Sequence, residues 1–159
     1  MDKQNCILLV DNGSYRAASV LSLRRIAKDL SNLSGFKVHP VSLLHSAKID
    51  PDQLGGIPAD TVEPFLKEML DAGTSNFLVV PLFFGRSAAI YEYLPQRIEE
   101  LKNEFTNLKV RISEPLVNMA DSSNDDVAKI LADLVRLKIS EKNLKKPSVT
   151  LVDHGTPRK

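Results

Sequence analysis

Short apolar runs alternate with helical repeats along this chain, and that order restricts it to few folds. The apolar runs lie at residues 6–10, 36–44, 77–84, 108–112 and 149–152. Several are continuous rather than alternating, which is typical of strands covered on both faces. Between the runs, apolar residues recur at spacings of three and four, as they do on one face of a helix. The order predicts an α/β domain: a four-stranded parallel sheet with right-handed crossovers and helices on both faces.

The charge balance gives no reason to expect nucleic acid or an anionic membrane as a partner. The 159 residues include 21 basic and 20 acidic side chains, so the formal net charge is +1. No apolar stretch approaches the roughly 20 residues that a spanning helix needs. The single cysteine, Cys6, excludes a disulfide within the chain and is compatible with a reducing compartment. We therefore expect a cytoplasmic protein.

A function should be sought at the carboxyl edge of the sheet, where parallel α/β proteins bind their ligands. Three segments should emerge there, at residues 11–15, 45–59 and 84–94. The middle segment contains Asp50-Pro51 and Gly55-Gly56, which predict an irregular surface loop.

The start of the chain is repeated near its end. Residues 7–16 and 149–158 are identical at five of ten positions, and both have an apolar run that leads into a glycine turn. Shared turn chemistry within one α/β protein is one explanation. Because turn chemistry does not require the matching Asp and Arg, we favour a tandem duplication. Residues 1–143 would form a first domain, and 144–159 would be a linker and the first strand of a second, truncated repeat.

Two motifs resemble those of the sirohydrochlorin chelatases of the CbiX type. Leu8-Leu9-Val10-Asp11-Asn12-Gly13-Ser14 is similar to the family's opening strand and His-Gly-Ser turn. Val79-Val80-Pro81-Leu82-Phe83-Phe84 and Tyr91-Glu92-Tyr93-Leu94-Pro95 are similar to its Pro-Leu-Phe strand and the start of the following helix. The resemblance spans nearly all of residues 1–143 and implies a chelatase-like three-layer sandwich.

The resemblance also implies a chemistry, the insertion of Co²⁺ or Fe²⁺ into a tetrapyrrole in cobalamin or siroheme synthesis, without ATP. In the family two histidines bind the metal, which is a substrate, and help to remove the pyrrole protons. This sequence has Asn12 and Ala89 at those two positions, whereas His154 in the second repeat matches the first histidine. An amide is a poor ligand for these ions and is no base at neutral pH, and a methyl group has no donor atom.

The resemblance and its two departures together predict a degenerate first half that helps to form the tetrapyrrole cleft. Such a chain alone should be inactive and should bind no cofactor, and its partner would be its own C-terminal half or a homodimer mate. Two alternatives stay open. The chain could be a metal-free tetrapyrrole-binding or dimerising scaffold, or an active chelatase that uses His45, Glu92 and His154 as ligands.

Several residues at the expected edge are candidates for substrate binding, and each also has a structural explanation. Gly13 and Ser14 lead into a helix N-terminus that could hold a carboxylate, although Ser14 could equally be only a helix cap. Arg86 could pair with a substrate carboxylate, and His45 could replace a metal ligand, although single loop residues of both kinds are commonly just solvated. The complete candidate set for substrate is Asn12, Gly13, Ser14, Arg86, Tyr91 and Glu92, with His154 and His45 as candidate metal ligands.

Overall fold

A computed structural model describes residues 6–118, 120–121 and 123–152 of the chain. These fall into two compact units, residues 1–120 and 121–159. The first unit contains the whole sheet, and the second contains one long helix.

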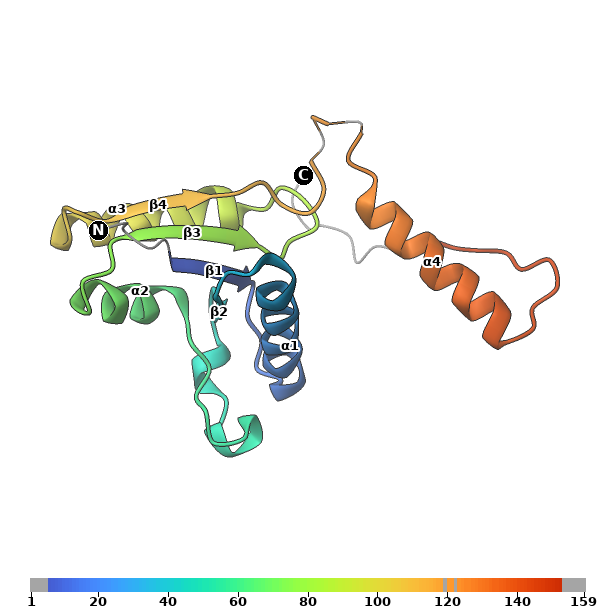
Figure 1. Ribbon diagram of the computed structural model, residues 1–159, viewed down its shortest axis with the longest axis horizontal. Coiled ribbons are helices and arrows are strands. Elements are labelled where there is room, and N and C mark those ends of the chain that lie inside the picture. Colours follow the sequence, from blue (N-terminus) through green and yellow to red (C-terminus); the bar gives the residue numbers. More distant parts are fainter. Residues whose placement is uncertain (1–5, 119, 122, 153–159) are drawn as a thin grey trace. The chain divides into compact units, whose positions relative to one another are not determined.

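The sheet of the first unit has the predicted four parallel strands. They are β1 (Cys6–Asp11), β2 (Val38–Ser42), β3 (Asn76–Pro81) and β4 (Lys109–Ile112), in the order β2-β1-β3-β4 (Figure 1). The central strand β1 pairs with β2 and β3, so that Ile7 lies opposite Val38 on one side and Leu78 on the other. All four carboxyl ends therefore lie at one edge.

Helices cover both faces of this sheet, as the continuous apolar runs predicted. On one face α1 (Ala17–Ser34) packs Leu23 and Ala27 against Leu9 of β1. On the other face α2 (Val62–Asp71) and α3 (Leu94–Glu104) pack against Leu8 and Val10 of the same strand. Alternate residues of β1 thus belong to different cores, which gives three layers.

Helix α1 begins after Arg16 and ends at Gly35. Gly35 ends the helix in the left-handed region at φ 75°, and its N–H donates to Ser31 O, as expected of a C-terminal glycine. The N-cap is Arg16 rather than Ser14, and the Ser14 Oγ accepts a hydrogen bond from Arg16 N at 3.1 Å. The hydroxyl therefore closes the turn two residues before the helix instead of capping it.

The segment after β2 is more ordered than the irregular loop that the sequence predicted. It contains two short 3₁₀ helices, η1 (Ser46–Lys48) and η2 (Pro51–Leu54). Arg24 of α1 holds this segment because its guanidinium donates to the carbonyls of Leu54, Ile57 and Pro58 at 2.7–3.0 Å.

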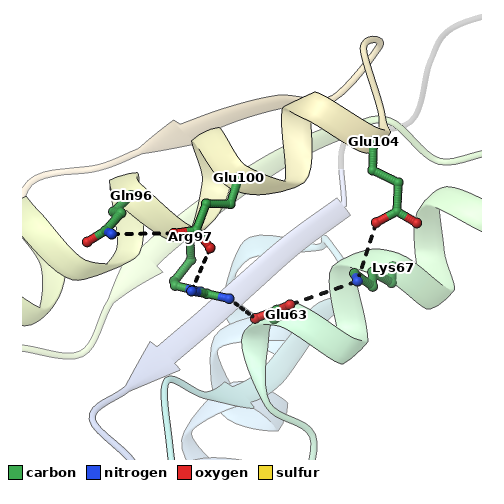
Figure 2. A network of polar contacts seen from close by, with 6 residues as sticks. All are labelled: Glu63, Lys67, Gln96, Arg97, Glu100 and Glu104. Carbon is green, nitrogen blue, oxygen red and sulfur yellow. Dashed lines mark hydrogen bonds and ion pairs between the residues drawn. The ribbon is translucent and has the colours of Figure 1, made fainter.

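Charged side chains join α2 to α3 on the same side of the sheet (Figure 2). Arg97 of α3 donates to Glu63 of α2 at 3.0 Å and pairs with Glu100 at 2.6 Å. Lys67 of α2 lies 3.9 Å from Glu63 and 3.4 Å from Glu104. The hydrogen bond that Arg97 donates to Glu63 is the main reason why the pKa of Arg97 lies above its usual value. The network joins α2 to α3, which directly follows the π-helical turn η3 (Ala89–Tyr93).

The second unit contains the predicted fourth helix, α4 (Asp126–Glu141). Residues 149–152, which the sequence predicts as the first strand of a second repeat, have no regular secondary structure. His154 lies outside the described residues, and the second repeat stays a prediction. Among the described residues, no helix is long and apolar enough to span a membrane.

Candidate functional site

The loops after β1 and β2 are locked together at the carboxyl edge of the sheet by a close backbone approach. Gly13 has φ 85°, and a Cβ atom built on it would lie only 1.7 Å from the carbonyl oxygen of Leu44. No side chain fits that space, so glycine is required both for the turn and for the contact. The backbone bond from Leu43 N to Asp11 O, at 2.8 Å, joins the same two loops.

A chain of hydrogen bonds reinforces this contact. The Asp11 carboxylate accepts from Gly13 N at 3.0 Å and from the Ser42 hydroxyl. The fully buried Ser46 hydroxyl lies 2.8 Å from the Ser42 hydroxyl and accepts from Ser14 N at 3.1 Å. Desolvation raises the pKa of Asp11 above its usual value, although the two bonds that it accepts oppose the change. These hydrogen bonds therefore hold the turn at residues 11–14 against the segment after β2.

The two positions that the family resemblance assigns to histidine lie on the loops that follow neighbouring strands. Asn12 follows β1 and is exposed, so its amide faces solvent at the carboxyl edge. Ala89 begins η3 after β3, is half-buried, and packs against the hydrophobic core. The structure gives the first position an exposed amide and the second a methyl group that contributes to packing.

Arg86 and Tyr91, both predicted as substrate-binding residues, form a cluster with Glu114, which the sequence places directly after the fourth strand, either as a wall of the cleft or as part of an ordinary turn. The guanidinium of Arg86 lies 4.2 Å above the Tyr91 ring, a cation–π contact. The Tyr91 hydroxyl donates to Glu114 Oε2 at 3.1 Å, and desolvation followed by this bond raises the pKa of Tyr91. Glu114 follows β4, so the cluster links two neighbouring loops. Glu92 is exposed on η3.

The sequence offers His45 as a candidate metal ligand, but in the structure its imidazole contacts the side chain of Tyr15. Its Nδ1 lies 3.0 Å from the Tyr15 hydroxyl, and the two rings stack with their centres 4.8 Å apart. Tyr15 was not predicted, although its place directly after the Gly-Ser turn would have been a signal. No group of three or more His, Cys, Asp or Glu side chains within the described ranges could hold a metal ion.

The fold defines a class of protein: a three-layer α/β protein with ordered loops at the carboxyl ends of its parallel strands. The CbiX family matches residues 6–136. The chain therefore belongs to the CbiX family.

One solved structure with the same fold comes from Marinobacter aquaeolei VT8 and is described as a CbiX protein of cobalamin (vitamin B12) biosynthesis. The two chains superpose with a TM-score of 0.63 at 18% sequence identity, over 87% of this chain and 99% of the other. At this identity the likeness shows the fold. No curated protein matches the chain.

Substitution of Gly13 tests the close approach of the two loops. Gly13→Ala should lower the free energy of unfolding by more than about 3 kcal/mol, because the new methyl group meets a backbone carbonyl and φ is positive. Gly35→Ala is the matched control, since Gly35 also has positive φ but has no atom within 4 Å of the added Cβ. It should cost about 1 kcal/mol. Equal losses in urea denaturation would mean that the contact is unimportant.

The Asp11 carboxyl should make the stability depend on pH. Because its pKa is higher in the folded than in the unfolded protein, the folded protein binds more protons between the two values, and stability falls as pH rises through that window. Asp11→Asn removes this titration and keeps an oxygen for Gly13 N.

Relative to the natural chain, the Asp11→Asn variant should therefore gain stability as pH is raised from about 4 to 7, as followed by urea midpoints. Asp50→Asn is the control, because Asp50 forms the same turn bond, to Asp52 N at 3.0 Å, on the surface. A gain of the same size in the control would assign the effect to the turn and not to burial of Asp11.

Proposed function

We propose that this chain is a degenerate chelatase half that binds a flat, carboxylate-bearing tetrapyrrole at the carboxyl edge of its sheet. Membership of the CbiX family supports a chelatase-like function. The pathway would be cobalamin or siroheme synthesis, with Co²⁺ or Fe²⁺ as the metal substrate. The metal chemistry would be supplied by a second repeat that includes His154, or by a homodimer mate.

The identity of residues 12 and 89 carries the proposal. Insertion of a divalent ion into a tetrapyrrole needs ligands that deliver the ion and a base that accepts two pyrrole protons. Neutral imidazole does both near neutral pH. The Asn12 amide can do neither effectively, and Ala89 has no donor atom. The cleft-forming part of the function can nevertheless persist, because it depends on the fold and on other side chains.

The exposed side chains of the edge support tetrapyrrole binding. Tyr15 is 62% exposed and Phe84 is 70% exposed, on the loops after β1 and β3. Large exposed rings are suited to stacking on a flat aromatic ligand. Arg86 and Lys48 are exposed on loops at the same edge and offer positive charges to the carboxylates of such a ligand.

The first experiment separates binding from catalysis in the natural chain. Sirohydrochlorin is titrated into the protein and followed by its absorption spectrum, and Co²⁺ is then added. We expect a saturable spectral change, with cobalt insertion no faster than without protein. Absence of the spectral change would support a dimerising scaffold instead. Insertion well above background would contradict the proposal and favour an active chelatase with unusual ligands.

Restoring the two histidines tests the assignment of the positions directly. In the double variant Asn12→His/Ala89→His, Co²⁺ should bind, and insertion should rise at least about tenfold, on the scale of a restored general base. The control Asn107→His places an imidazole on the exposed turn before β4, far along the sheet from this edge. If the double variant folds but behaves like this control, the two positions are wrongly assigned.

A further inference from the structure

A pocket beside His45 is not accounted for by the family resemblance. It measures about 200 Å³, which is too small for a macrocycle but sufficient for a side arm. It lies between the segment after β2, the start of α2 and the turn η3. The polar residues that line it are His45, Lys48, Thr61, Glu63 and Tyr93.

The backbone at His45 is strained in a way that points to a function. His45 has φ 67° and ψ −38°, and Ser46 N donates to Leu44 O at 2.8 Å across it. This is close to the classic γ-turn, which is rare and strained for a residue with a side chain. The buried Ser46 hydroxyl and the Gly13 contact hold the turn in place. Strain that persists because its surroundings enforce it is a feature of binding and catalytic sites.

The strained turn places the imidazole against Tyr15. The rings stack at an angle of 27°, and the hydroxyl of Tyr15 engages Nδ1 of His45. With Nδ1 engaged and the ring plane fixed, Nε2 is the other polar atom of the imidazole. Lys48 lines the same pocket, and its Nζ lies 5.9 Å from the centre of the Tyr15 ring.

The charges of the pocket favour an anion. Glu63 is its one acidic residue, and its carboxylate is already engaged by Arg97 at 3.0 Å and Lys67 at 3.9 Å (Figure 2). Lys48 forms no ion pair with any residue that the structure describes. A lysine in that position attracts a carboxylate, and the Thr61 and Tyr93 hydroxyls and the imidazole can donate hydrogen bonds to one.

We propose that this pocket binds one carboxylate side arm of the tetrapyrrole, with Lys48 and His45 as its binding residues and Tyr15 as the positioning residue of His45. The inference rests on the proposed function and goes beyond it, because it assigns a substrate contact to residues outside the two family motifs. The arm would anchor one edge of the ligand near β2, while the ring lies over the loops after β1 and β3.

The test measures the affinity of the natural chain and three variants for uroporphyrin, which carries eight carboxylates, by fluorescence titration. Lys48→Met and His45→Gln should each weaken binding about tenfold, the effect of one charge-assisted hydrogen bond at a partly exposed site. Tyr15→Phe keeps the stacking and loses the bond to Nδ1, so its loss should be smaller. Lys37→Met is the control, because it removes the same charge from the residue before β2, at the opposite edge of the sheet.

Two further measurements make the outcomes decisive. A tetracationic porphyrin should not lose affinity in Lys48→Met, and 50 mM succinate should compete with uroporphyrin in the natural chain but much less in Lys48→Met. If uroporphyrin binds but the affinities of Lys48→Met and His45→Gln equal that of Lys37→Met, the pocket is wrongly assigned. The proposed function then stands. If the natural chain binds no tetrapyrrole, the assignment of the pocket and the proposed function are both wrong. If succinate binds at Lys48 without competing, the pocket takes a free carboxylate and not a substrate arm.

Discussion

The contact between Gly13 and the carbonyl of Leu44 determines how the carboxyl edge of this protein is built. The absence of a side chain at residue 13 lets the loop after β1 lie directly on the loop after β2. Hydrogen bonds through Asp11, Ser42 and Ser46 then fix the two loops to each other. Everything that follows in these loops, including the exposed Asn12, Tyr15 and His45, takes its position from that contact.

The same contact explains how a strained residue persists at the edge. A non-glycine residue in an unfavourable backbone region costs roughly 1–3 kcal/mol. At His45 the cost is offset locally, because Ser46 is fully buried and hydrogen-bonded on one side, and the ring stacks on Tyr15 on the other. A glycine at residue 45 would avoid the strain but would remove the imidazole. The strained turn is therefore explained if the His45 imidazole binds the ligand, as proposed above.

The sequence predicts the sheet and its layers well, because apolar periodicity depends on burial, and burial of β1 on both faces leaves a continuous run. It also places Asn12, Arg86 and Tyr91 at the correct edge, since chain order fixes which loops follow which strands. It does not predict the contacts of Glu114 with Tyr91 and of Tyr15 with His45, because those contacts join loops 23 and 30 residues apart. The apolar run at residues 149–152 has no regular secondary structure, and the repeat that it would begin stays a prediction. An apolar run of four residues specifies a strand only when another strand is beside it.

Asn12 and Ala89, the two positions that the family resemblance assigns to histidine, differ in how they contribute to the fold. Asn12 is exposed and touches no core, so either an amide or an imidazole can occupy it without cost to folding. Ala89 packs against the core at the start of η3, where a small side chain contributes to the fold. A larger side chain at residue 89 would therefore have to displace part of this packing. The locked loops after β1 and β2 do not depend on residue 89, because the contacts that fix them are made by Asp11, Gly13, Ser42 and Ser46.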